Sequence, residues 1–301
     1  MTSLFREYKA SLKSVVVEEY LDLFFFRPIA FLLVKLLYRF PVTPNQISVT
    51  AMIVGVVGGI VFAFGTPQAL FWGAFLYGSA NVIDCSDGMI ARLKHNGTKT
   101  GRIIDGAVDY VVSFFVYNGM GLGLTLQAAS YGLEFPAHPW LIVFFSGVST
   151  AIHSGITDNV RNAYETFVNG KKILPQLEYD EFQEELKRLE GVKGEGLNRF
   201  IIRAYLRYTK FQLGNNTAAV YYQPDEYKRY NRFMVPLWNL IGPTTHIAVF
   251  MIAGFLYQPE IFFWYALVFS NIWMIVMGII QYFVNKNLTP FSTAQPRVSQ
   301  Q

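Results

Sequence analysis

Charged side chains are scarce in this sequence. Asp, Glu, Lys and Arg together make up 15% of its 301 residues, while 52% are hydrophobic and 17% are aromatic. Soluble domains carry about 25% charged residues, so the composition excludes an ordinary soluble domain. It predicts an all-α, polytopic membrane protein, whose net charge of +4 has meaning only once the charges are assigned to loops.

Cysteine is almost absent as well. Cys85 is the single cysteine, which excludes an intrachain disulfide, and its position among acidic residues indicates packing instead of redox chemistry. No His or Cys residues stand at the spacing of zinc ligands, and no nucleic-acid-binding motif is present. Residues 5–23 mix apolar and charged side chains, so we expect no cleaved signal peptide.

Apolar runs of the length that a bilayer requires, about 20 residues, recur along the chain. They predict six transmembrane helices, near 46–65, 69–92, 102–126, 139–166, 232–257 and 261–284. Residues 27–40 are too short and too basic to span and fit an interfacial helix, or alternatively a packed cytoplasmic helix. The expected domains are N-terminal cytoplasmic and interfacial helices (1–41), spans one to four with the catalytic motif (42–166), a helical cytoplasmic insertion (167–231), spans five and six (232–285) and a cytoplasmic tail (286–301).

Lysine and arginine are unevenly divided between the two sides of these spans. The connections after spans one, three and five contain none, whereas both termini and the remaining loops are basic. Basic loops stay in the cytoplasm, so we expect both termini and the active site at the cytoplasmic face of a multi-pass protein, in a prokaryotic cell membrane.

Four aspartates gather within residues 81–109. Asp84 and Asp87 share one face of a helix, and Asp105 and Asp109 share a face of the next, with spacings of three, eighteen and four residues along the chain. Carboxylates that adjoin membrane-grade apolar sequence are costly unless they serve a site. The pattern therefore predicts a functional acidic cluster.

A turn between the two helices would place their acidic faces opposite each other. His95, Asn96 and Gly97 suit such a turn. The ionised carboxylates then need counter-charge, and oxygen-only ligands favour a hard divalent cation, Mg²⁺ or Mn²⁺.

Further residues complete a gapped pattern around these acids. It reads Asp84-x2-Asp87-Gly88-x2-Ala91-Arg92-x8-Gly101-x3-Asp105-x3-Asp109. With no position missing, it resembles the signature of the CDP-alcohol phosphotransferases, membrane enzymes of phospholipid synthesis, and the local similarity covers about residues 42–125. The resemblance implies transfer of a substituted phosphate from a CDP-linked alcohol to an acceptor hydroxyl, with release of CMP. Phosphoryl transfer of this kind often uses a pair of divalent ions, so we expect two.

The resemblance also implies roles for single residues. It makes Asp84, Asp87 and Asp105 metal ligands and places Asp109 near the acceptor hydroxyl as the base, with Asp109 also a candidate fourth ligand. The candidates for binding the nucleotide and its diphosphate are Gly88, Ala91, Arg92, Gly101, Arg102 and Asn45. For Asn45 two interpretations stay open, because Pro44-Asn45 resembles the family's entry to the nucleotide pocket and is also ordinary helix-capping sequence.

The fourth span ends in a polar face that includes Asp158 and Arg161. This face either marks a helix leaving the membrane or completes the wall of the site, where Arg161 can hold a phosphate of the acceptor through its planar fork. His246 is expected to lie too deep for the chemistry. The aspartate pattern does not say whether the donor or the acceptor carries the lipid, because it is common to both kinds of enzyme.

A transporter is the alternative class of function. Carboxylates in membrane helices can bind a coupling cation, but these acids stand at helix ends and no inverted repeat is visible. The glycines at 55, 59, 119 and 123 permit close helix packing, either within one chain or in the homodimer that we expect. In the insertion, Arg199, Arg203, Arg207 and Lys210 form a basic stripe suited to anionic headgroups or to an anionic substrate.

Overall fold

Helices make up nearly all of the computed structural model, which describes residues 3–12, 14–131, 137–171, 175–192, 194–213 and 221–291. The helices are α1 (Ser3–Ser11), η1 (Asp22–Phe26), α2 (Arg27–Leu37), α3 (Pro44–Phe62), α4 (Pro67–Lys94), α5 (Lys99–Tyr131), α6 (Pro139–Asn169), α7 (Pro175–Leu189), α8 (Gly196–Leu213), α9 (Pro224–Asn231), α10 (Met234–Trp238), η2 (Asn239–Ile241), α11 (Pro243–Phe255), α12 (Pro259–Trp264), η3 (Tyr265–Phe269) and α13 (Ser270–Lys286). Within the described ranges the strands are β1 (Tyr221–Tyr222) and β2 (Pro290–Phe291), which pair antiparallel. Residues 292–301 of the expected tail lie outside the described residues.

The number of membrane-crossing helices differs from the prediction. Five helical stretches are long and apolar enough to cross: Pro44–Phe62, Lys99–Ala129, Pro139–Asn169, Met234–Phe255 and Pro259–Lys286. The expected span at 69–92 lies within α4, which is not among them, because Asn81, Asp84 and Asp87 make its second half polar. The polytopic all-α class is confirmed, and length and composition select five of the six expected spans, although α4 lies beside the spans α3 and α5.

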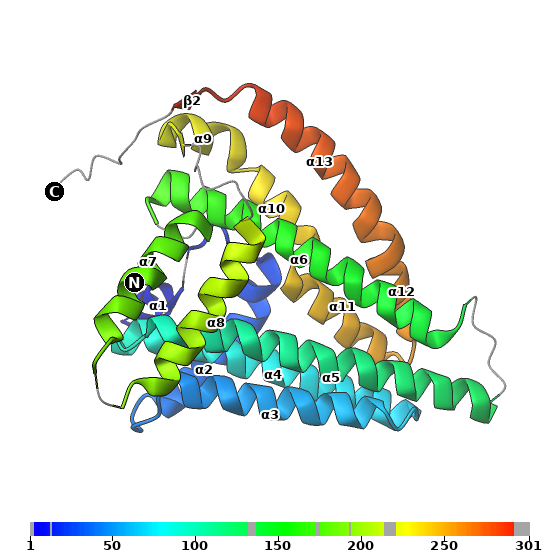
Figure 1. Ribbon diagram of the computed structural model, residues 1–301. Coiled ribbons are helices and arrows are strands. Elements are labelled where there is room, and N and C mark those ends of the chain that lie inside the picture. The colour runs from blue at the N-terminus through cyan, green and yellow to red at the C-terminus, as the bar shows by residue number, and fades with distance from the viewer. Residues whose placement is uncertain are drawn as a thin grey trace.

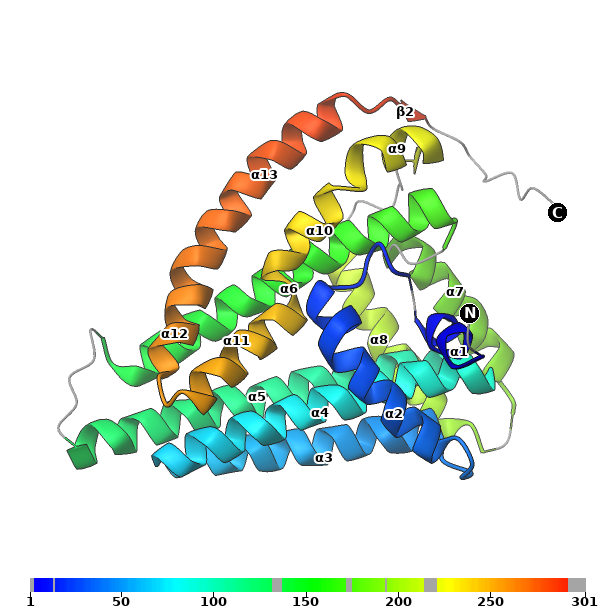
Figure 2. The same cartoon turned by 180° about the vertical axis from the view of Figure 1, so that it is seen from behind.

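The long helices form two groups (Figure 1). α3, α4 and α5 run side by side, and α6, α10, α11 and α13 run obliquely away from them. Between the two groups, at the end where α5 begins, α8 lies across one side and α2 across the other, as the view from behind shows (Figure 2).

Local sequence determines where the site helices begin and end. Thr43 caps α3 through a capping box with Gln46, and Pro44 occupies the first turn, so the capping interpretation of this stretch is confirmed. α4 ends with Lys94, and the next residue, His95, caps it in the left-handed backbone conformation, with φ of 52°. α5 then begins at Lys99, so the predicted turn is present.

Glycines let α3 and α5 meet backbone to backbone. A Cβ placed on Gly119 would collide with the carbonyl oxygen of Gly59, and one placed on Gly59 would stand 2.5 Å from the carbonyl carbon of Phe115. Gly123 faces the carbonyl oxygen of Phe62 in the same way, whereas Gly55 makes room for the side chain of Val112 on α5. These glycines therefore serve packing within one chain, and the homodimer stays a prediction.

A Gly119→Ala substitution is expected to destabilise the protein, because the added methyl group overpacks this contact at a cost of roughly 1–3 kcal/mol. Thermal unfolding of the purified variant in detergent should show a lowered Tm. Gly278→Ala is the matched control, since nothing lies within 4 Å of a Cβ there, and its Tm should be unchanged or slightly raised. Equal Tm values for Gly119→Ala and the original chain would contradict this packing.

The expected insertion folds as a helical hairpin against α5. Phe182 and Leu189 of α7 pack on Ile202 and Leu206 of α8, with Ile103 of α5 against the same cluster. The predicted apolar face of α7 is confirmed, and Gly191, with φ of 84°, follows the end of the helix. On α8, Arg203, Arg207 and Lys210 are exposed.

Candidate metal centre and active site

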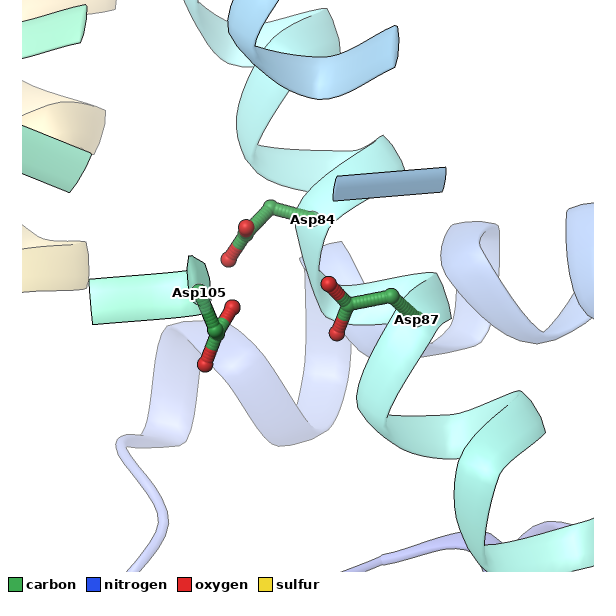
Figure 3. A group of neighbouring side chains, drawn as sticks. All are labelled: Asp84, Asp87 and Asp105. Carbon is green, nitrogen blue, oxygen red and sulfur yellow. The ribbon is translucent and has the colours of Figure 1, made fainter. Parts of the chain in front are cut away.

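Three aspartates converge from two neighbouring helices (Figure 3). Asp84 and Asp87 stand three residues apart on α4, and Asp105 stands on α5, which the turn after His95 returns beside α4. One carboxylate oxygen from each lies within 4.8 Å of the others. The spacing read from the sequence therefore becomes a compact acidic cluster in three dimensions.

The surroundings of the cluster suit a divalent cation. Asp87 is buried and accepts a hydrogen bond from the Ser48 hydroxyl of α3, which fixes the orientation of its carboxylate. Asp84 Oδ1 is also buried, yet it has no hydrogen-bond partner. Crowded carboxylates repel one another, and a buried acceptor without a donor is costly. A hard cation bound by these oxygens would remove both costs, so the residues present fit Mg²⁺ or Mn²⁺.

Asp109 stands apart from this cluster. It follows Asp105 by one turn of α5, but it is not part of the group of mutually close carboxylates and its side chain is exposed. It interacts electrostatically with Asp105 and Asp84 of the cluster, and also with Asp158 of α6. Among the described residues, the structure thus groups three of the four predicted acids and leaves the fourth facing α6.

The residues expected beside the nucleotide lie around the same helix ends. Gly88 lies under the Arg92 guanidinium, whose Nη1 and Nη2 would stand 3.3 Å and 3.4 Å from an added Cβ. Ala91 is half-buried one turn further along α4. Asn45 Oδ1 would lie 2.9 Å from a Cβ on Gly101, so the start of α3 and the first turn of α5 are brought into contact. The predicted proximity of Asn45 to the motif is present.

The two candidate arginines for the diphosphate differ in their surroundings. Arg92 is half-buried on α4 and donates from Nε to the Ser11 carbonyl oxygen at 2.5 Å. Arg102 turns toward the insertion, where it pairs with Glu178 at 3.2 Å and Glu181 at 3.5 Å. Arg92 is therefore close enough to the cluster to act electrostatically on Asp87. Arg102 instead links α5 to α7.

The guanidinium of Arg161 is bound by three acceptors within the protein. Its Nε donates to Asn239 Oδ1 at 2.8 Å, its Nη2 to Glu19 Oε1 at 2.7 Å and its Nη1 to Asp158 Oδ1 at 3.3 Å. Glu19 was missed by sequence reasoning, because a single Glu in a mixed polar segment gives no signal. It lies 142 residues from Arg161, and only the tertiary fold brings them together.

Glu19 belongs to a buried segment that caps α11. Its carboxylate accepts from the backbone N–H of Thr244 at 3.0 Å and of Thr245 at 2.8 Å, at the start of that helix. Nearby, Asp22 accepts from the Thr244 hydroxyl at 3.0 Å, and burial raises the pKa of Asp22 to about 6. The chain between α1 and α2 is thereby fixed to the helices on the α6 side of the site.

His246 lies away from the acidic cluster, as expected. It is buried, and its ring stacks on that of His153 of α6 at a centroid distance of 5.3 Å. The Thr150 hydroxyl lies 3.3 Å from its Nδ1. These contacts join α6 to α11 behind the site.

Comparison with known proteins bears on the same segment. Residues 41–167 match the family model described as CDP-alcohol phosphatidyltransferase. The chain is also similar to the phosphatidylinositol phosphate synthase of Corynebacterium glutamicum, with 33% identity over 77 residues, which is 26% of this chain and 34% of that protein. The match thus spans about a third of the length of this curated relative. These findings confirm the family resemblance drawn from the aspartate pattern.

Proposed function

We propose, from the premise that residues 41–167 belong to the CDP-alcohol phosphotransferase family, that this chain makes phospholipids by metal-dependent transfer of a substituted phosphate. The donor is a CDP-linked alcohol, either CDP-diacylglycerol or a CDP-linked polar alcohol, and the acceptor is an alcohol. The observation that carries the proposal is the cluster of Asp84, Asp87 and Asp105 inside that segment.

The three clustered acids are the proposed metal ligands. Mg²⁺ or Mn²⁺ held there, as one ion or the expected pair, would neutralise the diphosphate and stabilise developing charge by several kcal/mol. Ser48 keeps the Asp87 carboxylate in position. The orphaned oxygen of Asp84 is the second feature that supports this assignment.

The proposed base is Asp109. Its carboxylate takes the proton of the acceptor hydroxyl while the acceptor oxygen forms a bond to phosphorus. The bond from that phosphorus to the CMP oxygen breaks, and CMP leaves with the bonding electron pair. The position of Asp109 supports this role, because it lies one turn from a ligand yet outside the cluster, on the side that faces α6.

The nucleotide is proposed to lie over Gly88 and Ala91, because these small residues let a ligand approach the helix backbone beside the Arg92 guanidinium. Arg92 balances the diphosphate, and Asn45, in contact with Gly101, lies at the entrance. The lipid bilayer is the remaining partner, and it supplies whichever substrate carries the acyl chains.

The test uses the purified full chain with Mg²⁺ and a panel of CDP-alcohols and acceptor alcohols, and measures CMP release and product mass. We expect one donor and acceptor pair to give CMP and a phosphodiester in equal amounts, with loss of both on chelation of the metal. Binding of none of the CDP-alcohols, together with no CMP release from any pair, would contradict the proposal.

We also propose that the site opens to the cytoplasm, since the basic loops lie on the side of the acidic helix ends. In a Cys85→Ser background, Glu184→Cys on the exposed face of α7 should resist a membrane-impermeant thiol reagent in intact cells and react in inverted vesicles. Ser130→Cys, in the last turn of α5 at the opposite end of the spans, should behave in the opposite way. Labelling of Glu184→Cys from outside would reverse the orientation.

A further inference from the structure

Two stripes of side chains run next to each other along α8. The basic stripe consists of Arg199, Arg203, Arg207 and Lys210, of which the last three are exposed. The apolar stripe consists of Leu197, Phe200, Ala204 and Tyr208, all of them exposed. Residues three or four positions apart share one face of a helix, so each stripe is continuous. The stripes adjoin because Phe200, Ala204 and Tyr208 each directly follow a basic residue.

The opposite face of α8 is buried, which fixes the direction in which both stripes point. Ile202 and Leu206 pack on α7, with Ile103 of α5 against the same cluster. The hairpin is also tied to α5 by Lys99 and Arg102, which pair with acids of α7. Contacts within the chain therefore hold α8 in place and leave its two stripes on the outside.

The cations of the basic stripe differ from Lys99 and Arg102 in their surroundings. Within the described ranges, the side chains of Arg203, Arg207 and Lys210 take part in no ion pair or hydrogen bond. Glu195, the acid that precedes the stripe along the chain, accepts a hydrogen bond from the Asn198 side chain instead. The stripe thus presents positive charge to which a negatively charged partner is complementary.

The apolar stripe favours a bilayer over a soluble anion as this partner. Leu197 and Phe200 are 70% and 69% exposed, and a soluble phosphate would leave both of them in water. An interfacial helix with a basic side and an apolar side enters the boundary between headgroups and acyl chains. An anionic lipid surface therefore satisfies both stripes together.

The position of α8 relative to the spans agrees with such a surface. α5 has 33 residues and is about 50 Å long, whereas the hydrocarbon core of a bilayer is about 30 Å thick. The ends of α5 therefore extend into the headgroup regions, and α8 contacts α5 at Ile103, in its second turn. α8 crosses α5 instead of running along it (Figure 1), as a helix in the plane of the surface would.

We infer that the two stripes of α8 form a binding surface for anionic phospholipids in the bilayer leaflet beside the acidic helix ends. Arg203, Arg207 and Lys210 bind the lipid phosphates, and Leu197 and Phe200 enter the boundary with the acyl chains. The inference goes beyond the proposed function, because it concerns a surface outside the site and its test requires no turnover.

Quenching of a fluorophore on α8 by lipids tests this surface in the full chain. The fluorophore is attached to Ala204→Cys in the Cys85→Ser background, and the protein is reconstituted into phosphatidylcholine vesicles that contain a small fraction of phosphatidylglycerol. An equal amount of brominated acyl chain is carried either by the phosphatidylglycerol or by the phosphatidylcholine. Quenching by brominated phosphatidylglycerol should be at least about tenfold more efficient, because each Lys or Arg near an anionic surface contributes about fivefold. A fluorophore on Phe64→Cys, exposed at the other end of the spans, should be quenched equally by both lipids.

Paired substitutions test whether charge is the cause. Arg203→Gln with Arg207→Gln should lower the ratio of the two quenching efficiencies at least about fivefold. Arg203→Lys with Arg207→Lys keeps the charge and should keep the ratio. Lys187→Gln with Arg188→Gln removes the same charge from the exposed surface of α7 and is the matched control, which should leave the ratio unchanged.

Three results would overturn the inference. They are equal quenching of the α8 fluorophore by the two lipids, a ratio that survives Arg203→Gln with Arg207→Gln, and a ratio that inorganic phosphate abolishes at constant ionic strength. The last result would identify a soluble phosphate as the ligand instead of a lipid. If the quenching ratio behaves as expected while no CDP-alcohol is bound or turned over, the proposed function is wrong and this inference stands.

Discussion

Asp87→Asn should lower kcat/KM by roughly a thousandfold, the loss expected when several kcal/mol of charge stabilisation disappear. Asp87 is buried in the cluster and is oriented by Ser48, so the amide removes a negative ligand without changing the side-chain volume. Metal titrations of activity should show a weakened affinity together with the lower rate.

Two companion variants make the Asp87 result specific. Ser48→Ala removes only the orienting hydrogen bond and should cost roughly 10–100-fold in metal affinity. Asp180→Asn changes an exposed acid on α7 and should change neither affinity nor rate. Normal metal dependence in Asp87→Asn would exclude this residue as a ligand.

Asp109→Asn should lower kcat by roughly a hundredfold or more, within the range of 10²–10⁴ that a general base contributes. The amide cannot take the acceptor's proton. Because Asp109 lies outside the group of close carboxylates, metal dependence and affinity for the CDP-linked donor should change little.

Side-by-side titration of Asp109→Asn and Asp87→Asn separates base from ligand. The metal concentration at half-maximal activity and the donor Kd are measured for both. If Asp109→Asn loses metal as severely as Asp87→Asn, then Asp109 is a ligand first, and another group removes the proton.

Short-range patterns in the sequence predicted the centre of the site well. The spacing of Asp84 and Asp87 places both on one face of α4, and the turn-forming residues after Leu93 return α5 to the same place. The same periodicity predicted the apolar face of α7 that packs on α8. In both cases the information lies within a few helical turns.

Contacts between distant segments could not be predicted in this way. The partners of Arg102 on α7 and the partner Glu19 of Arg161 lie 76 to 142 residues away along the chain, so no local pattern indicated these pairs. Length and composition select five of the six expected spans, because α4 combines a membrane-length helix with the polar residues of the site. In that helix the polar residues of the site lower the mean hydropathy by which a membrane span is recognised.

The central claim is that an acceptor hydroxyl attacks the phosphorus of a CDP-linked alcohol. It can be tested by labelling the hydroxyl oxygen of the active acceptor with ¹⁸O and weighing both products by mass spectrometry after reaction with the reconstituted chain and Mg²⁺. We predict that all of the label enters the phosphodiester and that CMP stays unlabelled. Label in CMP, or its loss from the phosphodiester, would contradict the mechanism.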